Sequence, residues 1–207
     1  MARGTPDKYS VIIEAAVAEI ARCGYDRARM ADIARAAGVA AGTPYLYFKG
    51  KQDLLVAVFR EKVGRWVEVM QAAVAETPDP RQQLRRLVRG QFSALAAQPL
   101  FAVITQIEAR QSDPAIRREI NHVMEEYYFS WLGLLIQAGQ EQGAFRRDVD
   151  WRLIRNMVFG TLDQTVTAWV LSEFRWDLVA QAEPTYELLA AAITAPVTGE
   201  ANLSAMH

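Results

Sequence analysis

This chain is poor in the residues that build catalytic, redox and metal sites. Its 207 residues include one cysteine, Cys23, and two histidines, His122 and His207. A single cysteine excludes an intrachain disulfide, and so few histidines and cysteines form no cluster with metal-ligand spacing. The glycine-rich motifs of nucleotide-binding proteins and the serine motif of hydrolases are missing as well. We therefore expect no metal, no cofactor and no enzyme activity.

Long apolar runs are also missing. No segment reaches the ~18 consecutive apolar residues of a membrane span, although apolar residues make up 51% of the chain and charged residues 23%. The opening residues, MARGTPDKYS, lack the apolar stretch of a secretory signal. With the single cysteine, these absences predict a globular cytoplasmic protein that has no membrane partner.

An excess of either charge is lacking overall but present locally. The chain carries 23 basic and 24 acidic residues, for a net charge of −1. Residues 1–51 hold eight Lys and Arg against five Asp and Glu, for +3, so the remainder carries −4. A basic first segment on an acidic body suits a protein that approaches a phosphate backbone with that segment.

Alternating strand patterns are absent, and helical periodicity dominates the chain. We therefore predict an all-α fold, with breaks at glycines, prolines and Asp-Pro pairs. The predicted helices span 8–23, 28–36, 41–48, 52–77, 81–97, 100–111, 114–143, 150–172 and 183–195.

The segment 30–51, MADIARAAGVAAGTPYLYFKGK, carries the clearest motif. It is organised as a helix, a turn at Gly38, a second short helix and a basic exit, which is the layout of a helix-turn-helix. Ala34 supplies the small residue where the two helices cross. The core beneath is predicted to contain Ile33, Val39 and Leu46.

Short polar and aromatic side chains of the second helix are the predicted DNA contacts. Thr43 and Tyr45 can reach base edges or methyl groups, whereas Tyr47 and Lys51 can contact phosphates. Tyr45 and Tyr47 stand two residues apart and cannot share one helix face, which argues against a fully packed aromatic turn. The predicted DNA-binding set is Arg29, Thr43, Pro44, Tyr45, Tyr47, Lys49 and Lys51.

The run GVAAGTPYLYFKGKQDLL closely resembles the N-terminal signature of the TetR family of transcriptional repressors. This resemblance implies a three-helix DNA-binding domain over 1–51 and a larger helical ligand-binding and dimerisation domain over 52–195, with 196–207 as a frayed tail. The chain departs from the family at Ala28 and Ala40, which replace capping Ser or Thr residues. Pro44 also removes a backbone donor from the second helix.

Two segments of the body, TQIEARQSDPAIRREI and FGTLDQTVTAWV, resemble the fatty-acid-degradation repressors of that family. The resemblance implies a repressor of fatty acid degradation genes that binds a palindromic operator as a dimer and is released by long-chain acyl-CoA. The helix after Gly50 would act as the lever between ligand and DNA. A TetR-type repressor that responds to a drug or another hydrophobic effector remains the alternative.

An acyl-CoA needs an apolar slot for its tail and arginines for its phosphates. The predicted ligand-binding set is Arg85, Arg86, Arg89, Phe92, Leu95, Phe101, Ile104, Arg110, Arg117, Met124, Tyr128, Trp131 and Phe159. Each apolar member also fits an ordinary core position, and each arginine a solvated helix face.

Two C-terminal helices are the predicted dimer interface, since two from each subunit would make a four-helix contact. The residues expected there are Ile154, Met157, Val158, Leu162, Val166, Trp169, Val170, Leu188, Leu189 and Ala192.

Overall fold

The structure, a computed structural model, describes residues 7–110 and 113–194. Helices account for all the regular structure in these two ranges, which confirms the all-α prediction. In chain order they are α1 Lys8–Cys23, α2 Met30–Ala36, η1 Thr43–Leu46, α3 Lys51–Ala75, α4 Pro80–Ala96, α5 Pro99–Gln106, η2 Glu108–Arg110, α6 Pro114–Met124, η3 Glu125–Phe129, α7 Ser130–Glu141, α8 Trp151–Leu171, η4 Val179–Gln181 and α9 Ala182–Ile193. The predicted tail, 196–207, lies outside the described residues.

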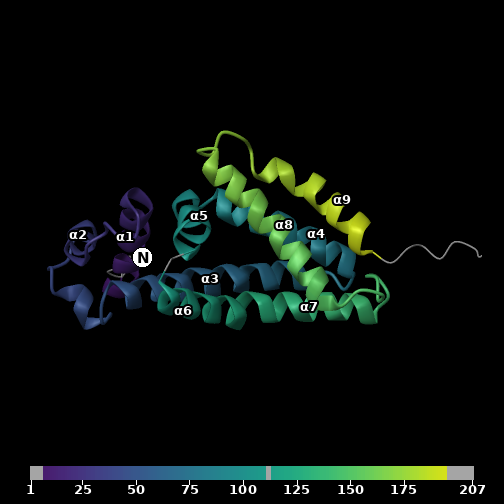
Figure 1. The fold of residues 1–207 in the computed structure, drawn as a ribbon, viewed down its shortest axis with the longest axis horizontal. Coiled ribbons are helices and arrows are strands. Elements are labelled where there is room, and N and C mark those ends of the chain that lie inside the picture. Colours follow the sequence, from purple (N-terminus) through teal and green to yellow (C-terminus); the bar gives the residue numbers. More distant parts are fainter. Residues whose placement is uncertain (1–6, 111–112, 195–207) are drawn as a thin grey trace, which may run out of the picture.

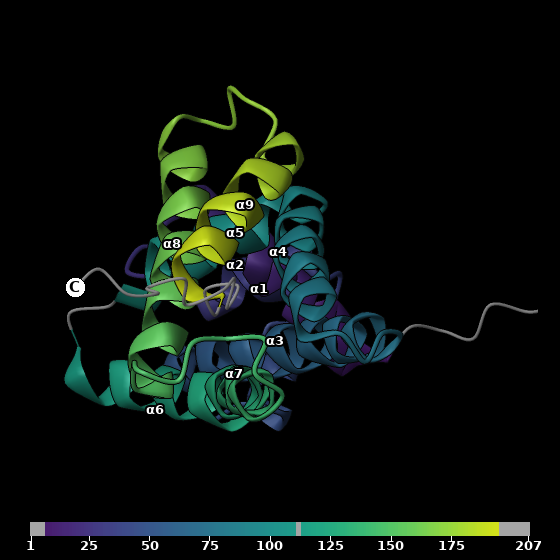
Figure 2. The same ribbon diagram turned by 90° about the vertical axis from the view of Figure 1, so that its right-hand side faces the viewer.

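The molecule is elongated, with a small head at one end and a larger body (Figure 1). The head consists of α1, α2 and η1, and α3 runs from it along the length of the body. The rod formed by α6, η3 and α7 lies beside α3, while α4, α8 and α9 cover the other side (Figure 2). The short helix α5 packs against both α1 and α8, so it links head and body.

Aspartate caps and glycine stops explain where the helices begin and end. Asp7, Asp79, Asp113 and Asp150 each accept a hydrogen bond from the backbone N–H two residues later, at the starts of α1, α4, α6 and α8. Gly38 ends α2 with φ +67°, a left-handed conformation that glycine adopts without a Cβ penalty.

One predicted helix is wrong in type, and another contains a π-helical segment. The predicted helix 41–48 is the short 3-10 turn η1, in which Tyr47 N–H and Phe48 N–H both donate to the carbonyl of Pro44. Pro44 has no N–H and cannot continue an α-helical ladder. The predicted helix 114–143 is a rod with a π-helical segment, η3, inside it. There Ser130 Oγ donates to the Glu125 carbonyl at 2.7 Å.

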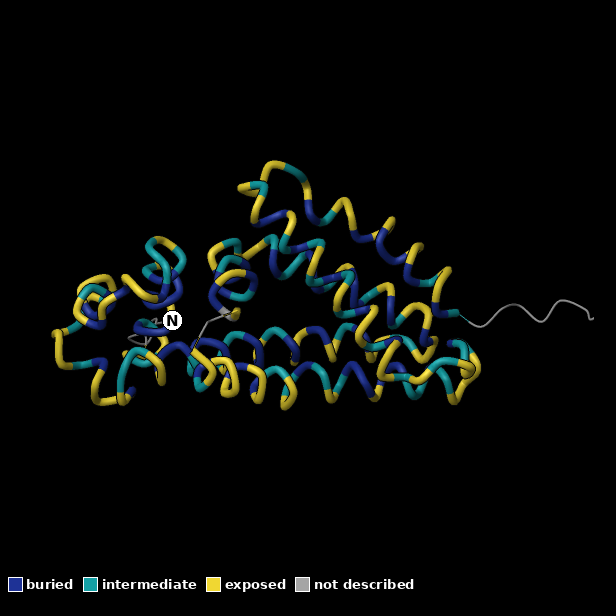
Figure 3. Tube along the Cα trace, in the orientation of Figure 1, coloured by how far each residue is buried: buried dark blue, intermediate teal, exposed yellow. Residues whose placement is uncertain are grey.

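A continuous apolar core runs from the head into the body (Figure 3). Ile12 and Ile20 of α1 are buried in the head, and Phe59, Phe92 and Tyr128 are buried in the body. Because α3 contributes to both parts of this core, the head and the proximal body share one helix. None of the described helices is by itself long and apolar enough to cross a membrane, although α4 and α5, bent by 107°, approach that composition together.

The outward face of α8 differs from the predicted dimer face. Four residues assigned to that interface, Ile154, Val158, Leu162 and Val166, are buried inside the protomer. Leu189, Trp169 and Val170 are likewise buried. A helix has two apolar sides here, and the sequence pattern alone does not tell which one faces its own core. The exposed stripe contains two of the predicted residues, Met157 of α8 and Leu188 of α9, together with Leu153, Ala168 and Leu171 of α8.

Candidate functional site

The head presents a row of exposed side chains on η1. Tyr45 is 58%, Leu46 81% and Tyr47 42% exposed, whereas Pro44 is buried. Two predictions are therefore wrong: Pro44 is a core residue and not a DNA contact, and Leu46 is not in the core. A 3-10 turn has three residues per turn in place of 3.6, so its side chains rotate away from their α-helical directions.

An aromatic cluster holds η1 on the first helix of the head. The ring centroids of Phe48 and Tyr9 lie 5.4 Å apart, and those of Tyr47 and Tyr9 lie 6.0 Å apart in an edge contact. Burial raises the pKa of Tyr9, so its hydroxyl stays protonated at neutral pH. The cluster fixes the base of η1 and leaves its tip in solvent.

The predicted basic contacts divide into exposed and engaged groups. Arg29, at the start of α2, and Lys49 are exposed. Lys51 turns inward, and its ammonium donates to the carbonyls of Tyr25 and Asp26 at 2.7 and 3.0 Å. Two of its three N–H donors are thus used inside the protein, which leaves one for a phosphate.

The loop between α1 and α2 is also held from the body. Glu108 of η2 is nearly buried, and its carboxylate accepts a hydrogen bond from the backbone N–H of Tyr25 at 3.1 Å. Lys51 binds the carbonyl of the same residue. The loop is therefore a joint between the two parts: Lys51, where α3 begins in the head, and Glu108 of the body both bind the backbone of Tyr25.

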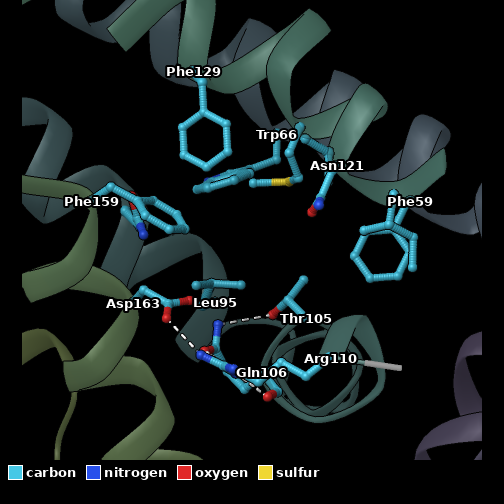
Figure 4. A pocket seen from close by; sticks show the side chains of 14 residues that line it. Phe59, Trp66, Leu95, Thr105, Gln106, Arg110, Asn121, Phe129, Phe159 and Asp163 are labelled. Atoms are coloured by element: carbon cyan, nitrogen blue, oxygen red, sulfur yellow. Dashed lines mark hydrogen bonds and ion pairs between the residues drawn. The ribbon is translucent and has the colours of Figure 1, made fainter. Parts of the chain in front are cut away.

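The body encloses a cavity of about 220 Å³ between α3, α4, α5, α6 and α8 (Figure 4). Most of its wall is apolar and aromatic, as in ligand pockets generally. The lining residues are Phe59, Val63, Trp66, Gln91, Leu95, Thr105, Gln106, Arg110, Ile120, Asn121, Met124, Phe129, Phe159 and Asp163. Four predicted ligand-binding residues, Leu95, Arg110, Met124 and Phe159, are among them.

Five predicted aromatic and apolar residues lie in the body without lining this cavity: Phe92, Phe101, Ile104, Tyr128 and Trp131. The first four are buried in the core, each on the side of its helix that faces a neighbouring helix. Tyr128 forms a second layer behind the pocket, because its hydroxyl donates to the Gln91 side-chain oxygen at 2.7 Å and its ring stacks on Trp66. Burial raises the pKa of Tyr128, which keeps this donor protonated.

The predicted arginine stripe of α4 faces away from the cavity. Arg85 pairs with Glu183 of α9, and Arg86 pairs with Glu76 and also donates to the Ala73 carbonyl at 2.8 Å. Arg89 is exposed on the same helix, and Arg117 is exposed on α6. These four arginines do not line the pocket.

The polar end of the pocket is an ion pair between Arg110 and Asp163, 2.7 Å apart (Figure 4). Arg110 also donates to the carbonyl of Gln106, a nearly buried residue. Burial raises the pKa of Asp163, and the charge of Arg110 opposes that shift. Asp163 is the single acid within α8, which is the one sequence signal that could have revealed it.

A second arginine, Arg155, lies one turn from Phe159 on α8. Its guanidinium is 3.8 Å from the Glu125 carboxylate and 5.5 Å from the ring centroids of Phe129 and Trp151. Its buried Nε has no hydrogen-bond partner among the described residues. Two arginine–carboxylate pairs therefore involve α8: Arg110–Asp163 in the pocket wall, and Arg155–Glu125 beside the lining residue Phe129.

Comparison with known families covers both parts of the chain. The family described as bacterial regulatory proteins, tetR family, matches residues 12–58, and the C-terminal region of YsiA-like proteins matches residues 59–192. The chain belongs to the TetR family. This TetR protein is a DNA-binding regulator and not an enzyme, and regulators of the family bind their operators as dimers.

Relatives of this TetR protein cover nearly its whole length. The fatty acid metabolism regulator protein of Bacillus subtilis (strain 168) is 41% identical over 186 residues, which are 90% of this chain and 95% of that protein. The structure of the fatty acid degradation regulator FadR from Bacillus halodurans has a TM-score of 0.85 and 43% identity, covering 88% of this chain and 97% of that one. FadR from Bacillus subtilis in complex with stearoyl-CoA has a TM-score of 0.86 and 40% identity, covering 89% and 99%.

Proposed function

We propose that this TetR protein is a cytoplasmic repressor of fatty acid degradation genes that long-chain acyl-CoA releases from a palindromic operator. The similarity to known regulators supports this assignment, because it extends over the body as well as the head, and the body is the part that binds the effector. One of them is a Bacillus subtilis regulator solved with stearoyl-CoA. The pocket supports the same ligand class, since it joins an apolar wall to Arg110 at its polar end.

The single observation that supports the response mechanism is the course of α3. This helix begins at Lys51 in the head and contributes Phe59, Val63 and Trp66 to the pocket wall. A ligand that displaces the wall therefore displaces the helix on which the head is mounted. The joint at Tyr25 and Glu108 offers a second connection, because Glu108 lies two residues from Arg110.

The size of the cavity determines which conformation of the body a long acyl chain binds more tightly. Ligand pockets occupy about 300–1,000 Å³, and the cavity here has about 220 Å³. A long acyl chain must part the helices around it, so it binds a wider body better than this one. A ligand shifts a conformational equilibrium only by such a difference in affinity between the two states. The wider state then turns the two heads of a dimer away from their operator spacing.

We assign the head group of the ligand to Arg110, in the pocket wall, and to Arg155, beside the lining residue Phe129. Arg110 and Arg155 each bridge α8 to the facing wall through a carboxylate. Phosphate is a bidentate partner for arginine, so a phosphorylated head group competes with Asp163 and Glu125 for these guanidinium groups. Loss of either bridge would favour the wider state.

The test is release of a fluorescent operator duplex from the full-length dimer, followed by anisotropy, with stearoyl-CoA, free coenzyme A and stearate compared. We expect stearoyl-CoA alone to release the DNA at low concentration. A Thr105→Trp variant, which fills the pocket, should bind DNA and ignore stearoyl-CoA, whereas Leu100→Trp, on the exposed side of the same helix, should respond normally. Release by a hydrophobic cation such as tetraphenylphosphonium, without release by stearoyl-CoA, would replace the proposal with the drug-responsive alternative.

A further inference from the structure

Leu46 is the most exposed large apolar side chain of the described residues, at 81%. Of the five that follow it, Leu153, Leu171 and Leu188 lie on the outward face of α8 and α9. Single exposed leucines are common and need no explanation. Leu46, however, lies in the head, next in sequence to the exposed Tyr45 and Tyr47, and its side chain is the most exposed of the three.

The backbone holds Leu46 in this outward position. Pro44 and Phe48 on either side of it are buried, and Phe48 N–H donates to the Pro44 carbonyl at 2.9 Å. The Phe48 ring also packs on Tyr9. Turning Leu46 inward would pull both anchors out of the core. Its exposure is therefore a built feature of η1.

The surroundings of Leu46 identify the surface that covers it. Figure 1 places α8 and α9 in the body, away from the head, so the outward face of those helices in a second subunit is not the cover. The head carries the helix-turn-helix of the TetR family, and basic side chains such as Arg29 and Lys49 are exposed on it. Leucine has no donor or acceptor for a phosphate or a base edge. The apolar group that the DNA major groove offers is the C5 methyl of thymine.

From these observations we infer that Leu46 selects thymine at one position of each operator half-site by packing on its C5 methyl group. The inference rests on the DNA-binding function of the head and adds the base it reads. A cytosine at that position presents an amino group to the leucine and no methyl, so it is disfavoured.

The test uses a palindromic duplex that the full-length dimer itself selects from a random-sequence library. Each thymine of a half-site is replaced by deoxyuridine, which removes only the methyl group, and the dissociation constant is measured for wild type and Leu46→Ala. At one position, deoxyuridine should weaken wild-type binding about fourfold per half-site, which corresponds to one buried methyl group. Leu46→Ala should bind thymine and deoxyuridine equally well there.

Controls separate this contact from folding and from the proposed function. Because Leu46 is exposed, Leu46→Ala should keep the wild-type melting temperature, and Leu134→Ala, another exposed leucine but in the body, should keep the full deoxyuridine effect. Equal sensitivity of Leu46→Ala and wild type to deoxyuridine at every position would overturn the inference. The inference would also be overturned if deoxyuridine at every position left the dissociation constant of wild type unchanged. Release of that same duplex by stearoyl-CoA would leave the proposed function standing, whereas failure to select any DNA would end both.

Discussion

The head and the body of this protein place their functional residues in opposite ways. In the head, Tyr45, Leu46 and Tyr47 are consecutive, and one short turn exposes all three. In the body, the pocket wall is assembled from α3, α4, α5, α6 and α8, whose contributions lie up to about half the chain apart. An exposed DNA-binding surface can be encoded in a local sequence motif, whereas a buried pocket depends on how helices that are distant in the sequence pack together.

The comparison also separates two uses of apolar residues. In the body, a side chain that lines the pocket and one that fills the core can be one turn apart on one helix, as Leu95 and Phe92 are. The core residue contributes stability whether or not ligand is present. The lining residue Leu95 is also buried in the core, but it faces the cavity and can contact a ligand as well. Mutations should therefore divide the body into these two groups, while those on the head surface should change DNA affinity alone.

The largest expected effect comes from a core residue that the sequence pattern assigned to the ligand. Phe92 is fully buried outside the pocket, so Phe92→Ala should lower the free energy of unfolding by about 3–5 kcal/mol. Urea denaturation followed by circular dichroism measures it. The folded fraction should bind stearoyl-CoA with wild-type affinity.

Phe159→Ala provides the contrasting variant, because Phe159 is half-buried and lines the pocket. It should cost less stability than Phe92→Ala and weaken stearoyl-CoA binding, as measured by titration calorimetry. If Phe92→Ala lost much of its affinity for stearoyl-CoA while Phe159→Ala kept the wild-type affinity, the assignment of the two residues would be reversed.

A smaller effect is expected at the joint between the two regions. Glu108→Ala leaves the buried N–H of Tyr25 without its carboxylate acceptor, which should cost about 1–3 kcal/mol of unfolding free energy. The ratio of operator dissociation constants with and without stearoyl-CoA should fall, because one connection between pocket and head is gone. A Glu76→Ala control removes a glutamate that pairs with Arg86 on the surface and should change neither quantity. An unchanged ratio in Glu108→Ala would assign the coupling to α3 alone.

The sequence predicted the fold well because its signals are local. Helices begin at the prolines of two Asp-Pro pairs, Pro80 and Pro114, and end at glycines. Each of these signals acts within one helical turn, and the structure confirms them. The signature of the head is equally local. The prediction placed Leu46 in the core because it used α-helical spacing, whereas residues 43–46 form a 3-10 turn.

The pocket was harder to predict because its polar residues have no local motif. Gln106 and Asp163 lie 57 positions apart and meet only because α5 packs on α8. The arginines of α4 recur with helical spacing, but that spacing fixes only that they share a face, not whether the face is inside. Arg110, a predicted ligand-binding residue, lies in the pocket wall, whereas its acidic partner Asp163 was not predicted.

The smallest expected effect contrasts a carboxylate of each region by the sign of its pH dependence. In the body, burial raises the pKa of Asp163. Between the ordinary aspartate pKa of about 3.9 and this raised value, the folded protein keeps a proton that the unfolded chain has released. The free energy of unfolding therefore falls as pH rises through that window.

In the head, the hydrogen bond from Arg22 lowers the pKa of Glu19. Its contribution is present above the ordinary glutamate pKa and is lost as pH falls through the lowered value. Urea unfolding between about pH 3 and pH 7 should therefore show opposite changes of slope in Asp163→Asn and Glu19→Gln. Equal slopes in Asp163→Asn and wild type would mean that the charge of Arg110 offsets the burial of Asp163 completely, and the ionised pair would then add no net stability to the closed pocket.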